Sequence, residues 1–173
     1  THPGKKLIFM GNELGQMHEW DFDAALDWTW ASVDPYKQLQ WLVHDLNRLY
    51  KEQPALYELD GDPRGFEQIC FQDVEAGVTV FMRCACDHRD RLLVALNFTP
   101  TLREHYRFGT SYVCSYREIL NTDAAIYGGS NLGNRGLVDA SEIAWAGYKQ
   151  SLEITVPPLG AVILKAELDF GER

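Results

Sequence analysis

The sequence predicts a mainly β protein, in which one buried strand and one helix precede a C-terminal antiparallel β-sandwich. Three observations support this fold class. The four consecutive apolar residues Leu7–Met10 are typical of a strand that is covered on both faces in a parallel sheet. Apolar residues then recur at helical spacing between Tyr36 and Glu52. After Pro54 the helical period disappears, and short apolar runs alternate with turn-forming residues.

Polar residues follow the predicted first strand. Gly11 allows a sharp turn, and Asn12, Glu13 and Gln16 come just after it. In α/β barrels and open α/β sheets, ligands bind at the carboxyl ends of the strands. These side chains are therefore candidates for a binding site.

The predicted helix has one apolar face. Asp34 is expected to cap its N-terminus, Pro35 to occupy its first position and Pro54 to end it. Its apolar positions follow the i, i+3, i+4, i+7 pattern: Leu39, Leu42, Val43, Leu46, Leu49 and Tyr50. One strand and one helix do not make a parallel sheet. We therefore expect their apolar surface either to pack onto the β domain or to pair with a second copy in a dimer.

Seven short runs after Pro54 are predicted strands, because they are apolar or alternating and are separated by turn residues. They are Phe66–Phe71, Val78–Cys84, Leu92–Phe98, His105–Phe108, Tyr112–Leu120, Leu152–Val156 and Ala161–Leu164. The stretch Tyr127–Gly136 is rich in glycine and asparagine and is predicted to be a long surface loop.

Composition and charge exclude several classes of partner. The chain has 173 residues, 46% of them hydrophobic, which indicates a packed domain with an appendage. Its net charge of -9 disfavours nucleic acid and anionic membranes as partners. No apolar run approaches the roughly 20 residues that span a bilayer. No export signal is recognised at the start, so a cytoplasmic location is expected.

The four cysteines are expected to be reduced and mostly buried thiols. Cys84 and Cys86 are spaced too closely for a usual zinc site. Asp21, Asp23 and Asp27 do not match a calcium loop and are interpreted as a solvated acidic loop. We therefore expect no metal and no cofactor.

The opening segment Gly4–Gln16, with Glu19-Trp20 and Leu26-Asp27-Trp28, closely resembles the last barrel strand of the 1,4-alpha-glucan (glycogen) branching enzymes of the alpha-amylase superfamily. The resemblance continues in order through Leu46-Asn47, Tyr50, Ala55–Asp60, Gly65-Phe66-Glu67, Val94–Pro100, Tyr106–Gly109, Arg117–Asp123, Tyr127–Asn134 and Ser151–Leu159. Family members often carry arginine where this chain has His18, so a role of that arginine is not transferred to His18.

This resemblance implies a domain division and a reaction. Residues 1–53 would end a catalytic β/α (TIM) barrel with its last strand, loop and helix, and residues 54–173 would form a C-terminal all-β domain of the alpha-amylase type. The implied reaction cleaves an alpha-1,4-glucan with two carboxyl groups and transfers the segment to a sugar 6-hydroxyl, which makes the alpha-1,6 branches of glycogen. The motifs of the catalytic carboxylates are not in this chain. We therefore expect no catalytic residue here, and no branching activity from the chain alone.

Within the resemblance, Asn12, Glu13 and Trp20 are the residues assigned to substrate binding or to support of the catalytic groups. Glu13 is expected to orient active-site groups or to contact sugar hydroxyls with Asn12. The alternative is that Glu13 caps the following loop. Trp20 is expected to be exposed, because the apolar faces of sugar rings stack on tryptophan.

The other tryptophans carry weaker indications. Trp28 and Trp30 are either further sugar contacts or buried against the helix that begins at Tyr36. Trp41 and Trp145 are interpreted as structural. The run from Arg117 to Asn134 is interpreted mainly as holding turn geometry and domain docking, with glucan binding as the alternative.

Other functions remain open from sequence alone. The β part is alternatively an independent alpha-glucan-binding module or a purely structural domain that stabilises the parent enzyme. Another member of the alpha-amylase superfamily, such as a debranching enzyme, fits the motifs less well.

Overall fold

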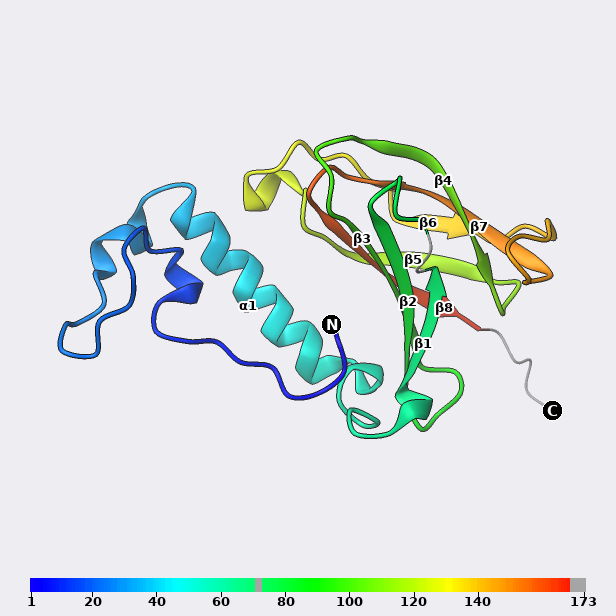
Figure 1. The fold of residues 1–173 in the computed structure, drawn as a ribbon, viewed down its shortest axis with the longest axis horizontal. Helices are drawn as coiled ribbons and strands as arrows, with labels where there is room; N and C mark the ends of the chain where they lie inside the picture. Colours follow the sequence, from blue (N-terminus) through cyan, green and yellow to red (C-terminus); the bar gives the residue numbers. More distant parts are fainter. Residues whose placement is uncertain (71–72, 169–173) are drawn as a thin grey trace.

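The computed structural model describes residues 1–70 and 73–168, which form three layers (Figure 1). One helix, α1 (Tyr36–Glu52), covers one face of a six-stranded sheet, and a two-stranded sheet covers the other face. The large sheet has the order β1-β2-β3-β8-β5-β6, and β4 pairs with β7. All the pairings are antiparallel, which confirms the predicted fold class of the β domain.

The strands agree closely with the sequence prediction. They are β1 (Phe66–Cys70), β2 (Val78–Cys84), β3 (Arg91–Asn97), β4 (Arg103–Thr110), β5 (Ser115–Asn121), β6 (Leu137–Asp139), β7 (Gln150–Val156) and β8 (Ala161–Glu167). All seven predicted strands are present, although Phe71 lies outside the described residues. Only β6 was not predicted, because three residues are too few to show an alternating pattern. Residues 128–136 contain no strand, as expected.

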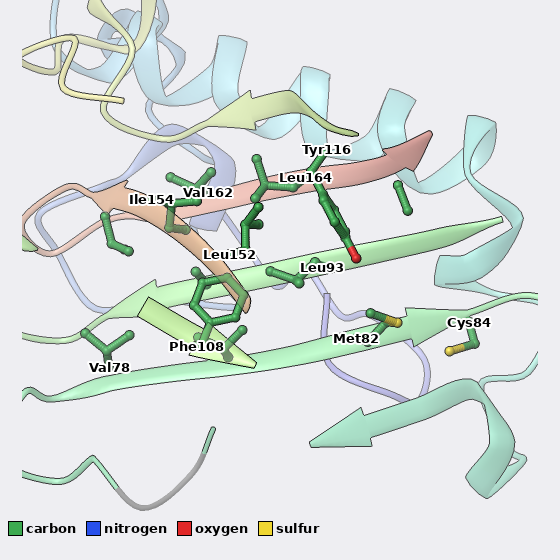
Figure 2. Packing of buried hydrophobic residues seen from close by; sticks show 14 residues of the cluster. Val78, Met82, Cys84, Leu93, Phe108, Tyr116, Leu152, Ile154, Val162 and Leu164 are labelled. Carbon is green, nitrogen blue, oxygen red and sulfur yellow. The ribbon is translucent and has the colours of Figure 1, made fainter. Parts of the chain in front are cut away.

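The main core lies between the two sheets (Figure 2). Alternate residues of a strand share a face, so β2 contributes every second side chain to this core. Phe108 of β4 and Leu152 of β7 meet it from the small sheet. The labelled side chains in Figure 2 are Val78, Met82, Cys84, Leu93, Phe108, Tyr116, Leu152, Ile154, Val162 and Leu164.

A second core lies between the outer face of the large sheet and α1. Phe81, Val94 and Ile163 point to this side and are buried. The helix covers them through Leu42, Leu46, Leu49 and Tyr50. The central strands are therefore covered on both faces, which explains why almost every residue of β2 and β3 is buried. This packing is one of the two expected ways of covering the apolar face of the helix.

Polar contacts also hold α1 on the β domain. The Tyr127 hydroxyl donates a hydrogen bond of 2.6 Å to Asp45 Oδ2. Burial and this hydrogen bond raise the pKa of Tyr127 to about 12. At the C-cap of the helix, Lys165 Nζ donates to Gln53 Oε1 at 2.7 Å. Two long-range hydrogen bonds therefore fix the C-terminal half of the helix on the β domain.

The structure corrects two local predictions. Leu7–Met10 is not a strand, because a strand needs a neighbour for its backbone hydrogen bonds and none of the described strands lies beside it. Leu7 is consequently 84% exposed. The helix begins one residue late: Pro35, and not Asp34, is the N-cap, and its carbonyl accepts from the Leu39 amide at 3.0 Å.

All four cysteines are free thiols, as predicted. Only Cys84 is buried; Cys70 and Cys114 are half-buried and Cys86 is exposed, so the expectation of mostly buried thiols was wrong. Within residues 1–70 and 73–168, no helix has the length and apolar character required to cross a bilayer.

Candidate functional site

The N-terminal segment is tied to the β domain by a cluster of charged residues. Arg83 of β2 is fully buried, and its guanidinium donates to Asp60 Oδ1 at 2.6 Å and to the Gly65 carbonyl at 3.0 Å. Lys6 Nζ lies 3.3 Å from Asp60 Oδ2 and 5.1 Å from the centre of the Tyr50 ring. We call Lys6, Tyr50, Asp60 and Arg83 the anchor cluster. It fixes the chain just before the candidate site.

The charge of Asp60 is maintained by this cluster. Burial would raise the pKa of Asp60, but the hydrogen bonds and positive charges of Arg83 and Lys6 outweigh it. The pKa of this carboxyl therefore lies below its ordinary value of 3.8. Asp60 is thus ionised at neutral pH and neutralises the buried Arg83.

A tight turn builds the candidate site. Gly11 has a left-handed φ of 90°, and the Gln16 side chain folds back to donate to the Met10 carbonyl at 3.1 Å. Because an L side chain is strained at this positive φ, the position favours glycine. The short 3-10 helix Asn12–Leu14 follows, and Leu14 is fully buried next to α1. The buried leucine holds the turn in place.

This turn and the following loop enclose a surface depression of about 390 Å³. Asn12 and Trp20 both line it, so two of the three predicted site residues come together. Trp20 is 48% exposed, as predicted, and contacts Phe9 edge-to-face with ring centres 5.3 Å apart. His18 and Glu19 complete the polar part of the wall. The depression offers an aromatic ring, an amide, an imidazole and a carboxylate to a ligand.

Glu13, the third predicted site residue, does not line the depression. It is half-buried, and its Oε2 atom is buried without a hydrogen-bond partner among the described residues. A buried acceptor without a partner is costly, typically about 1–3 kcal/mol. A role in capping the loop would give this oxygen a backbone partner. Within residues 1–70 and 73–168 this oxygen therefore makes no capping bond.

The structure separates the other tryptophans into exposed and packed side chains. Trp28 is exposed, and Trp30 packs on Tyr36 with ring centres 4.7 Å apart, so only Trp30 lies against the helix. Trp41 and Trp145 were expected to be structural, but both are exposed. Exposure arises because α1 turns Trp41 away from the sheet and Trp145 lies at the tip of a hairpin.

The glycine- and asparagine-rich loop is held by hydrogen bonds to its own backbone. The Asp123 carboxylate accepts from the amides of Ser130 and Leu132 at 3.0 and 2.9 Å. The Asn134 side chain bonds both the amide and the carbonyl of Thr155 in β7. These contacts support the structural interpretation of this stretch.

The loop with Asp21, Asp23 and Asp27 is solvated, as interpreted from the sequence. Asp21, Asp23 and Asp27 are all exposed. Among the described residues, no group of three or more His, Cys, Asp or Glu side chains is arranged to hold a metal ion.

Sequence reasoning missed the anchor cluster and the place of His18 in the depression. The sequence did contain a feature that could have predicted the cluster, because Arg83 lies within the apolar run Val78–Cys84. An arginine in a strand covered on both faces needs a buried acid, and Asp60 was the available one.

Comparisons with known proteins agree along the chain. Residues 69–167 match the family described as "Alpha amylase, C-terminal all-beta domain". The chain is 48% identical over 167 residues to a protein of Rhodopseudomonas palustris (strain HaA2) named 1,4-alpha-glucan branching enzyme GlgB. Proteins of the same name from Aquifex aeolicus and Saccharophagus degradans are 46% and 47% identical over 167 residues. Each match covers 96% of this chain but only 23%, 26% and 23% of the respective relative. The chain therefore spans about a quarter of the length of these relatives.

Proposed function

Because the chain belongs to the alpha-amylase C-terminal all-beta domain family, we propose that it is the C-terminal portion of a 1,4-alpha-glucan branching enzyme. In this proposal residues 1–53 end the catalytic β/α barrel, and residues 54–173 form the all-β domain. The parent transfers segments of alpha-1,4-glucan to 6-hydroxyl groups in the cytoplasm. Its substrate is an alpha-glucan; nucleic acid and membranes are not partners.

The observation that carries the proposal is the identity of 46–48% with several branching enzymes over 96% of the chain. The matched region includes the N-terminal segment and α1, and so extends well beyond the all-β domain. The exposed apolar residues Leu7, Ile8 and Phe9 support the proposal as well. In the parent this segment would gain the neighbouring strands that it lacks here, and its apolar side chains would be covered.

The depression beside Gly11 supports a place for glucan in the parent. Trp20 would stack on a sugar ring, and Asn12 would hydrogen bond its hydroxyls. Glu13 would support catalysis without performing it, by holding a neighbouring active-site group through its unpartnered oxygen. Retaining transfer itself requires two carboxyl groups on earlier barrel strands.

The first test concerns the chain alone. Residues 1–173 should leave the iodine-stained absorption spectrum of amylose unchanged, because they contain no motif for the catalytic pair of carboxylates. The same chain joined to the preceding barrel sequence should shift the spectrum toward that of branched glucan. Turnover by the chain alone, in a preparation free of host branching enzyme, would contradict the proposal that the catalytic carboxylates lie on earlier strands of the barrel.

The second test concerns Glu13 in the longer enzyme. Glu13→Gln should lower kcat about 10-fold to 100-fold, in the range expected for a supporting residue, and should leave measurable activity. Glu75→Gln is the matched control, because Glu75 is exposed and lies in the turn before β2. An unchanged kcat for Glu13→Gln would remove Glu13 from the site. Complete loss in a folded variant would make it a catalytic residue.

A further inference from the structure

We propose that the hairpin between β6 and β7 is a second alpha-glucan-binding site, in which the indole of Trp145 stacks on a glucose ring. This proposal rests on the proposed function for the identity of the polymer. The hairpin lies at the end of the sandwich away from α1 (Figure 1). It is therefore remote from the depression that Asn12 and Trp20 line.

The hairpin is a rigid support. Trp145 and Tyr148 exchange backbone hydrogen bonds of 3.0 and 2.9 Å. The two residues between them, Ala146 and Gly147, have left-handed φ angles of 46° and 91°. Positive φ at both central residues is the requirement of the two-residue turn that best fits the twist of a β-hairpin. The backbone at Trp145 is thus fixed before any ligand arrives.

Tyr148 fastens this turn to the sandwich. Its ring lies so close to β4 that a Cβ on Gly109 would be 2.2 Å from Tyr148 Cδ2. Its hydroxyl donates to Glu67 Oε1 of β1 at 3.2 Å. The half-buried Tyr148 therefore attaches the hairpin to the sandwich, and Trp145 is not needed for this attachment.

Trp145 is left without a partner. It is 47% exposed, and among the described residues no aromatic ring or cationic side chain packs on its ring. Trp41 is the contrasting case, because Lys37 Nζ lies over its ring at 4.9 Å. An exposed indole leaves apolar surface in contact with water. A ligand that covers the ring removes this surface from water, which is favourable.

The chemistry around Trp145 fits a neutral polyhydroxy ligand. The five tip residues Ile143–Gly147 are all exposed and carry no charge. The axial C–H groups of a glucose ring make an apolar face that matches an indole, while its hydroxyls need donors and acceptors. Glu142 and Lys149 are exposed on either side of the tip and supply both. The net charge of -9 further disfavours an anionic polymer.

Native gel electrophoresis in the presence of amylopectin tests the site on the 173-residue chain. The polymer should retard the wild-type chain, and Trp145→Ala should weaken the apparent affinity about tenfold, the effect of losing one stacking contact. Trp145→Phe should recover part of the affinity, because it restores a ring. Trp41→Ala is the matched control and should bind as the wild type does. Equal thermal unfolding midpoints would show that all variants fold.

Several outcomes would overturn the proposal. One is a wild-type chain that amylopectin does not retard, and another is equal retardation of the wild type and Trp145→Ala. If light scattering shows wild-type self-association that Trp145→Ala abolishes, the tip is an interface between copies and the glucan site is rejected. The iodine assay of the longer enzyme does not depend on this hairpin. A failed proposal for Trp145 is therefore distinguishable from a failed assignment of the parent reaction.

Discussion

Replacing Asp60 with asparagine is expected to lower the free energy of unfolding of this chain by about 3–5 kcal/mol, the usual cost of removing one partner of a buried ion pair. Arg83 is fully buried, and among the described residues Asp60 is the one carboxylate close to its guanidinium, at 2.6 Å. Asparagine has a similar shape but no charge. The variant therefore leaves a buried guanidinium without a counter-charge, and urea unfolding at pH 7 measures the loss.

The pH dependence gives an independent check. The folded-state pKa of Asp60 lies below 3.8, so its contribution to stability is present above that pH and is lost as the pH falls through the folded pKa. The stability difference between wild type and Asp60→Asn should be constant above pH 3.8 and should shrink below it. Asp87→Asn is the control, because its pair with Arg89 is exposed and should add little. Equal stability of Asp60→Asn and wild type would refute the anchor cluster.

Phe108→Ala is expected to destabilise the chain by about 3–5 kcal/mol, as is usual when a buried phenylalanine is truncated. Phe108 is 1% exposed and is one of the few side chains that the small sheet contributes to the core (Figure 2). Because only β4 and β7 cover that face, little other material is available to fill the resulting cavity.

Phe98→Ala is the matched control for this variant. Phe98 follows β3 and is largely exposed, so its truncation removes the same atoms without opening a cavity. The two variants should differ by several-fold in the loss of unfolding free energy measured with urea. A small loss for Phe108→Ala would mean that the two sheets do not share a tightly packed core.

The sequence predicted the β domain well, because each of its strands carries a local signal. Val78–Cys84 and Leu152–Val156 are bounded by turn residues. The apolar pattern within each of these strands can be recognised without knowing which strand pairs with it. The strand expected at Leu7–Met10 failed for the opposite reason. An apolar run shows that a segment needs cover, but whether it becomes a strand depends on the neighbours available to it. Strand pairing, which is a long-range property, was not readable from the sequence.

The candidate site was predicted in part. Asn12 and Trp20 were recognised because they follow a glycine turn and a family-like motif, and they do line one depression. Glu13 lies in a three-residue 3-10 helix and does not line the depression, and no periodicity in the sequence predicts such a short helix. Trp145 was interpreted as structural, but it is 47% exposed. Its exposure follows from Tyr148, which occupies the attachment point on Gly109.

The way α1 covers the large sheet bears on how such proteins are inherited. A gene segment that began at residue 54 would encode all eight strands but would carry a sheet with a bare apolar face, formed by residues such as Phe81, Val94 and Ile163. Recombination that joined this segment to a new barrel would yield an aggregation-prone product unless the new barrel supplied a matching helix. A segment that encodes the β domain together with the helix that covers it would therefore begin near residue 36. This start lies within residues 1–53, which are proposed to end the barrel. Exchange of β domains between enzymes should preserve this helix together with the strands that it covers.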